Sequence, residues 1–205
     1  MSLDTDVASA VLAGLRPFPV AVTTVSHGRA NGLISLSAGS GGIIPEAPRV
    51  TISLTKYNFT HDLLRESGVL AMHLLGADED VLERSLAIIM GLGGRSGRDG
   101  DKMGEFDTKP GVTGSPILLD ALSYVEGRVV GELVNEENTI FLADVVAAEQ
   151  LRPGSRLNIG TAWRTLPAEW TETYERDHIH QTNAARRGRG LPELTGGQTG
   201  GDALG

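Results

Sequence analysis

Two long segments in which apolar and polar residues alternate, 121–134 and 139–151, are separated by a very short polar connection. Alternation with a period of two is typical of a β-strand with one buried face. A connection this short joins antiparallel strands, because parallel strands need a crossover of roughly a dozen residues or more. The segment Phe18–Ser26 also alternates and is followed by a turn at His27-Gly28-Arg29, which predicts a second hairpin near the N-terminus.

Few helices are expected between these strands. The chain lacks the regular alternation of strands and helices that a doubly wound parallel sheet requires. The pattern therefore predicts a mainly β (α+β) fold, an antiparallel barrel with a few peripheral helices. Further strands are expected at 49–54 and 69–75, and helices at 4–15, 61–67 (capped by Thr60), 78–90 and 167–185.

The composition excludes several classes of function. The 205 residues carry a net charge of −8 and 40% are hydrophobic, which favours a folded, soluble cytoplasmic protein over a nucleic-acid or anionic-membrane binder. The absence of cysteine excludes disulfides, thiolate catalysis and cysteine-ligated metals. No apolar run approaches the roughly 20 residues that span a bilayer, and no signal peptide is apparent. No metal site is predicted, since His178 and His180 have no convergent acidic partner in the sequence.

A loop of small and hydroxyl residues, 31–42, lies between the predicted strands 18–26 and 49–54. Small side chains let a flat ligand approach the backbone closely. The polar turn 55–60 follows the second of these strands and leads into a helix, and a lysine, hydroxyls and a helix start together suit a phosphate. This order of elements favours a site for a flat, phosphorylated cofactor, with flavin mononucleotide (FMN) as the leading candidate.

The segment 91–104 is rich in glycine and charge, and we expect it to be a mobile loop. Two interpretations stay open for it: a lid that orders over a bound cofactor, or a solvated charged loop. Its glycines follow a predicted helix rather than a strand, so they do not form a dinucleotide-binding fingerprint. From Arg186 onward the chain is glycine-rich and is expected to be disordered or laid over a partner.

The order of several motifs resembles the flavin reductase-like, FMN-binding split-barrel family, over about residues 12–166. No single motif is specific; their order and spacing carry the resemblance. These motifs are Phe18-Pro-Val-Ala-Val-Thr-Thr-Val25, Asn31-Gly32 with its serine-rich loop, Val50-Thr-Ile-Ser-Leu54 after Pro48, Lys56-Tyr-Asn-Phe-Thr60, Ser67–Leu75, Gly114-Ser-Pro-Ile-Leu118 and Glu137–Val145.

The resemblance implies a homodimer of six-stranded antiparallel split β-barrels (Greek key) with FMN, or possibly FAD, near the dimer interface. It also implies hydride transfer from NADH or NADPH to the flavin, and a separate monooxygenase that uses the reduced flavin. The domain would span residues 1–166, with 167–205 as a helical extension and flexible tail. Position by position, the residues expected to meet the ring and ribityl chain are Ser35, Leu36, Ser37, Ala38, Ser53 and Leu54, and those expected to hold the phosphate are Lys56, Asn58 and Thr60.

The sequence departs from the family pattern at two places. The loop 39–48 replaces an Asp-Pro-Pro segment of many members, and Asn138 stands where many members have a histidine linked to nicotinamide use. The second departure keeps two alternatives open. One is an FMN-binding carrier or sensor with little NAD(P)H oxidation, and the other is an FMN-dependent oxidoreductase that acts directly on an organic substrate. No catalytic side chain is assigned, because hydride transfer to flavin needs few acid–base groups.

Overall fold

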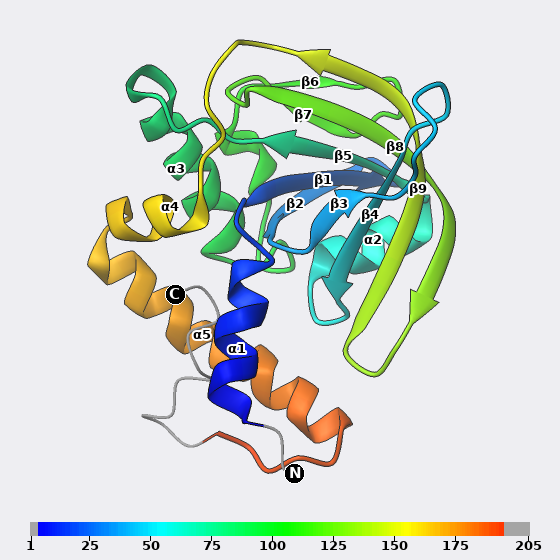
Figure 1. Ribbon diagram of the computed structural model, residues 1–205. Helices are drawn as coiled ribbons and strands as arrows, with labels where there is room; N and C mark the ends of the chain where they lie inside the picture. Colours follow the sequence, from blue (N-terminus) through cyan, green and yellow to red (C-terminus); the bar gives the residue numbers. More distant parts are fainter. Residues whose placement is uncertain (1–3, 195–205) are drawn as a thin grey trace.

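A curled antiparallel sheet forms the body of the protein in the computed structural model, which describes residues 4–194 (Figure 1). Its strand order is β2-β1-β5-β8-β9-β4-β3, and every neighbouring pair is antiparallel. The predicted mainly β, α+β barrel is therefore confirmed. The strands are β1 (Val20–Ser26), β2 (Arg29–Ser35), β3 (Ala38–Ser40), β4 (Arg49–Thr55), β5 (Val69–Leu74), β8 (Ser123–Val134) and β9 (Asn138–Gln150).

The two edge strands, β2 and β3, follow each other directly in the sequence. Only Leu36 and Ser37 separate them, although they lie at opposite ends of the strand order. The chain bends at these residues, where the amide of Ser53 on β4 donates a hydrogen bond to the carbonyl of Ser37 (2.9 Å). The bend carries the chain from one edge of the curled sheet directly to the other. It also divides one run of chain into two strands, so the sheet has seven strands where six were expected.

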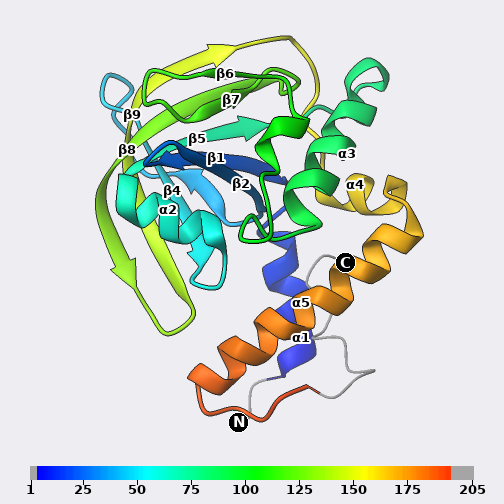
Figure 2. The ribbon, with the colours of Figure 1, turned by 180° about the vertical axis from the view of Figure 1, so that it is seen from behind.

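Helices lie outside the sheet, as the views from opposite sides show (Figures 1 and 2). They are α1 (Thr5–Gly14), α2 (Phe59–Ser67), α3 (Glu79–Gly93), α4 (Ile159–Thr165) and α5 (Ala168–Gly188), and a 3₁₀ turn covers Met103–Glu105. Strands β6 (Thr108–Pro110) and β7 (Pro116–Leu118) form a separate hairpin. No helix among residues 4–194 is both long and apolar enough to cross a membrane.

Three helix boundaries differ by two residues or more from those predicted. Helix α3 continues to Gly93, past its expected end at residue 90 and into the segment expected to be a loop. Helix α2 begins at Phe59, so Thr60 lies inside the helix and Asn58 is its N-cap residue. Helix α5 continues to Gly188, past the point where a disordered tail was expected. The reason is that the following chain folds back on α5, and the amide of Leu194 donates to the Asn183 side chain (2.8 Å). The rest of the predicted tail, 195–205, lies outside the described residues.

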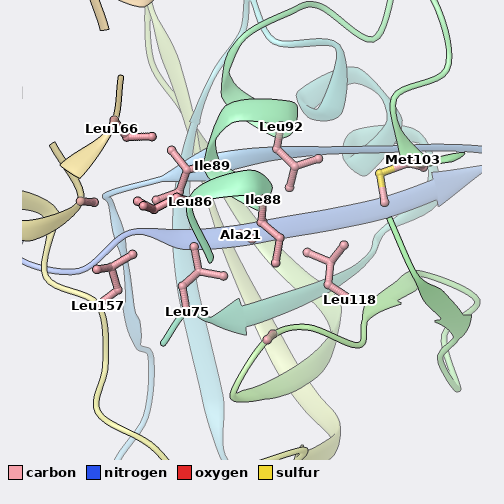
Figure 3. Packing of buried hydrophobic residues seen from close by; sticks show 12 residues of the cluster. Ala21, Leu75, Leu86, Ile88, Ile89, Leu92, Met103, Leu118, Leu157 and Leu166 are labelled. Atoms are coloured by element: carbon pink, nitrogen blue, oxygen red, sulfur yellow. The ribbon is translucent and has the colours of Figure 1, made fainter. Parts of the chain in front are cut away.

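Successive residues of β1 point to two different hydrophobic clusters. Ala21 packs against one face of α3, among Leu86, Ile89 and other residues that Figure 3 shows at close range. Val20 and Val22 point to the opposite side, into the barrel interior, where Phe141 of β9 is one of the largest buried side chains. The alternation seen in the sequence thus decides which cluster each side chain joins.

His73 on β5 lies fully inside the fold and connects two segments that are distant in sequence. Its Nδ1 donates to the carbonyl of Ala21 (3.1 Å), and its Nε2 accepts from the amide of Leu118 (3.1 Å). This pair of bonds requires the neutral ring with its proton on Nδ1. Burial lowers the pKa of His73 to about 4, against the opposing effects of the Ala21 carbonyl and of Glu126.

Protein stability should therefore fall as the pH drops. Between the unfolded pKa of 6.5 and the folded pKa of about 4, the unfolded chain binds a proton at His73 that the folded chain does not. The free energy of unfolding should decrease through this window by roughly 3 kcal/mol and level off below it. Urea unfolding followed by circular dichroism at several pH values measures this.

The His73→Gln variant is the control for that measurement. It should be less stable than the wild type at neutral pH, because the Ala21 and Leu118 contacts are lost or weakened. Its free energy of unfolding should also lack the decrease at acid pH that protonation of His73 causes in the wild type. An unchanged dependence of stability on pH in the variant would contradict the assignment.

Candidate functional site

The bend between β2 and β3 brings the predicted site residues 35–38 next to another predicted site residue, Ser53 of β4. Ser35 is buried, and its hydroxyl accepts from the amide of Ser37 (3.1 Å). Leu36 and Ala38 are half-buried, whereas Ser37 is exposed. The hydrogen bond from the Ser53 amide to the Ser37 carbonyl fixes this segment against β4. The structure thus brings Ser35, Leu36, Ser37, Ala38 and Ser53 to one corner of the barrel.

The predicted phosphate turn leaves the far end of β4. The backbone of this turn is fixed by a hydrogen bond from the Lys56 amide to the Glu137 carbonyl (2.9 Å). The Asn58 side chain donates to the hydroxyl of Thr55 and makes no capping bond to α2. Lys56 is half-buried, and within residues 4–194 its ammonium group forms no ion pair. A free cation therefore lies beside a helix start that no side chain caps, and such a start favours anions.

Two of the predicted site residues, Leu54 and Thr60, have buried side chains. Leu54 is 2% exposed and belongs to the barrel core. Thr60 is 1% exposed, and its hydroxyl accepts a hydrogen bond from the buried amide of Asn31 (2.9 Å). These side chains build the fold around the site and do not face open space. A contact between the Thr60 hydroxyl and a phosphate stays a prediction, and it requires this corner to open.

The glycine-rich loop 91–104 lies over the start of α2, which the sequence did not reveal. The guanidinium of Arg98 pairs with Asp62 (2.7 Å) and lies 5.2 Å from the ring centre of Phe59. Arg29 lies over the same ring at 4.2 Å and donates to the carbonyl of Gly97 (2.9 Å). The loop is thereby held next to the predicted phosphate turn. Only long-range contacts create this arrangement, so no local sequence signal marks it.

The same loop contains a buried lysine. Lys102 is 3% exposed, and its ammonium donates to the carbonyls of Leu92 (2.7 Å) and Arg95 (3.1 Å). Burial, together with the nearby charge of Arg95, lowers its pKa to about 8. A cation that satisfies carbonyls at the end of α3 anchors the loop there. Of the two interpretations left open for this loop, the one in which its charges are all solvated does not describe Lys102.

Asn138 lies close to the predicted phosphate turn. It is the first residue of β9 and pairs with Thr55 at the end of β4. Its amide donates to the side chain of Asn135 (2.7 Å), which shapes the tight connection from β8. The end of α5 reaches the same region, where Arg189 lies 3.8 Å from the carboxylate of Glu137. Asn138, where this chain departs from the pattern of the family that it resembles, is therefore next to the candidate site.

A cavity of about 260 Å³ lies at the other end of β4, between the start of β1 and the chain after β9. Leu36 and Ala38 line it, but Ser53, Lys56, Asn58 and Thr60 do not. The structure thus separates the predicted site residues into two groups. One group borders an apolar cavity that is partly open to solvent, and the other lies along the outer side of β4 and at its far end. Among residues 4–194 no group of three His, Asp or Glu side chains converges as a metal site would require.

Solved structures similar to this fold include several flavoproteins, each at low sequence identity. Component B of nitrilotriacetate monooxygenase from Mycobacterium thermoresistibile is 20% identical, with 82% of this chain and 92% of that chain covered at a TM-score of 0.62. An NADH:FAD oxidoreductase from Streptomyces globisporus C-1027 is 20% identical, with 77% of this chain and 90% of that chain covered at a TM-score of 0.60. An FMN-binding protein from Thermus thermophilus is 24% identical, with 65% of this chain and 72% of that chain covered at a TM-score of 0.57. These similarities support the fold.

The family assignment comes from the sequence itself. No curated protein matches the chain significantly. Residues 14–163, however, match the family described as "Flavin reductase like domain", which covers most of the chain. This range contains the serine-rich bend, the Lys56 turn and β8–β9. The chain belongs to the flavin reductase-like domain family.

Proposed function

We propose that this protein is a flavin reductase that binds FMN along the outer side of β4 and transfers hydride to it from NADH or NADPH. The observation that carries the proposal is the hydrogen bond between Ser53 and Ser37. It aligns the small-residue segment 35–38 with the strand that leads to Lys56 and to the start of α2. Family membership supports the flavin and the reductase chemistry.

The phosphate is proposed to lie at the turn after β4. The Lys56 ammonium has no competing carboxylate among the described residues, and the positive end of the nine-residue α2 lies beside it. A cation and a helix start attract the same anion from two directions. Asn58 belongs to this turn but bonds to Thr55, so its share in binding is through positioning of the backbone.

The ring is proposed to meet the backbone of residues 35–38. When bound, the flavin supplies the hydride-accepting chemistry itself, and the protein contributes orientation and hydrogen bonds. The exposed Ser37 and the half-buried Ser53 present hydroxyls at this corner. Leu54 contributes from within the core by fixing the strand. This arrangement needs no acid–base cluster, and none of the site residues above is an acid or a histidine.

The identity of the flavin and of the protein that uses the reduced flavin is proposed from the similar structures. The similar Streptomyces structure is named as an NADH:FAD oxidoreductase and the Thermus structure as FMN-binding, so FAD is the alternative to FMN. A component B of a monooxygenase is also among the similar structures. We therefore propose a separate monooxygenase as the partner. The acidic composition supports a cytoplasmic location. We keep residues 1–166 as the flavin-binding domain and 167–205 as its extension.

The carrier alternative is retained because of one observation. Asn138 lies beside Thr55, next to the proposed phosphate turn, where many family members have a histidine. Unlike a protonated histidine, an asparagine side chain carries no positive charge. Asparagine at this position would therefore weaken an interaction with the nicotinamide nucleotide, while the contacts proposed for the flavin phosphate remain. Flavin binding without NAD(P)H oxidation would favour this alternative.

A homodimer is proposed on the basis of an exposed apolar face. Leu133 of β8 and Ile140 of β9 are directly paired and are 65% and 38% exposed, and Ile140 pairs with Ser53 of the proposed site. Val130 and Val146 on the same two strands are also exposed. Leu133 and Ile140 lie on the same face because they are directly paired, and exposed apolar side chains of this kind are typical of an interface between copies.

Sedimentation velocity tests the dimer. The wild type should sediment as a dimer, and Leu133→Lys should shift it toward monomers because a charge would be buried in an apolar contact. Val112→Lys is the matched control, since Val112 is 69% exposed on the turn between β6 and β7. A wild-type monomer at working concentration would contradict the proposal.

The proposed function is tested by NADH and NADPH oxidation with and without added FMN, followed by the loss of nicotinamide absorbance. We expect turnover that depends on flavin. The Lys56→Gln variant should bind FMN at least about tenfold more weakly, because a charge-assisted contact to the phosphate is lost. Its affinity for riboflavin, which lacks the phosphate, should not change.

Lys109→Gln is the control, because it makes the same change of residue type and charge outside the proposed site, where Lys109 pairs with Glu149. FMN binding without oxidation of either nucleotide would contradict the proposal of a flavin reductase and would favour the alternative of an FMN-binding carrier. Equal FMN affinity in the wild type and in Lys56→Gln would place the phosphate elsewhere.

A further inference from the structure

The cavity of about 260 Å³ is partly open to solvent and is lined mainly by apolar side chains. Its lining includes residues of the chain where α1 leads into β1, and Val50 near the start of β4, whereas Lys56 follows the end of that strand. An engineered apolar cavity of roughly 150 Å³ binds benzene, so the space here suits an organic group of one or two rings. Its apolar lining includes Phe18, Leu36, Val50, Met72 and Leu74.

Two arginines, Arg16 and Arg156, also line this apolar space. Among residues 4–194 neither guanidinium forms an ion pair with a carboxylate. Arg16 donates only to the carbonyl of Leu12 (3.4 Å), and Arg156 lies 4.3 Å from the ring centre of Phe18. The chain as a whole carries a charge of −8, so two unpaired cations at one apolar cavity depart from its general character. Guanidinium groups bind carboxylates through two parallel hydrogen bonds.

The segments that carry the two arginines are fixed to the rest of the fold. The amide of Ile159 donates to the carbonyl of Pro17 (2.8 Å), which connects the chain beside Arg16 to the chain after Arg156. Arg156 itself forms a β-bridge with Gly76, and the next amide, of Leu157, donates to the Leu75 carbonyl (2.8 Å). Backbone segments held in this way lose little freedom when a ligand binds.

We propose that this cavity binds a small aromatic carboxylate, with its rings among the apolar side chains and its carboxylate between Arg16 and Arg156. The site is separate from the proposed phosphate turn, because Val50 and Lys56 lie at opposite ends of β4, roughly 20 Å apart at the rise of an extended strand. Leu36 and Ala38 line this cavity and also belong to the segment proposed to meet the flavin ring. The inference rests on the cavity and its charges and does not depend on flavin chemistry.

Isothermal titration calorimetry of flavin-free protein with 2-naphthoate and with its neutral analogue 2-naphthamide tests the site. Naphthoate should bind at least about tenfold more tightly than naphthamide. The Arg16→Gln/Arg156→Gln double variant should lose this preference and keep its naphthamide affinity. Arg176→Gln removes a charge on α5, where the nearest carboxylate, Asp177, is 4.0 Å away, and should behave as the wild type.

A second variant, Val50→Phe, fills the cavity and should weaken both ligands, and circular dichroism establishes that each variant is folded. Equal affinity for the two ligands, or an unchanged preference in the double arginine variant, would overturn the proposal. Direct competition of naphthoate with FMN would also overturn it, since the cavity would then belong to the flavin. Absence of FMN binding would remove the proposed function alone and leave the naphthoate result intact.

Discussion

The rest of the structure depends on the bend at Leu36–Ser37, where the Ser53 amide meets the Ser37 carbonyl. This connection carries the chain from one edge strand, β2, directly to the other, β3, so that the sheet curls round on itself. It also holds the serine-rich segment against β4. A single local feature thus shapes the curl of the sheet and places the predicted ring-binding segment.

The two ends of β4 have opposite surroundings. At one end Lys56 lies beside the start of α2, partly covered by the loop that Arg29, Arg98 and Phe59 hold in place. At the other end Val50 faces an apolar cavity with Arg16 and Arg156. Within residues 4–194, this acidic chain thus places cations without a carboxylate partner near both ends of β4. This is the physical basis for placing an anionic cofactor at one end and an acidic organic molecule at the other.

Strand alternation and turn chemistry were enough to predict the fold class, because burial of one sheet face imposes a period of two that single residues display. The predicted connection between 121–134 and 139–151 is present as the β8–β9 hairpin. The predicted start of α2, at residue 61, was wrong by two residues, because the helix begins at Phe59. In the sequence Thr60 resembles a helix cap, but in the fold its buried hydroxyl accepts a hydrogen bond from Asn31. The anchoring of the loop 91–104 and the cavity arise from contacts between distant segments. No local pattern encodes such contacts, so sequence reasoning could not find them.

The most direct test of the account is an FMN titration of isotopically labelled protein, followed by the amide signals of each residue. The account predicts that shifts concentrate at 35–38 and 53–60, on both sides of the Ser37–Ser53 contact. Shifts confined to the cavity around Arg16 and Arg156, or no shifts at all with saturating FMN, would contradict it.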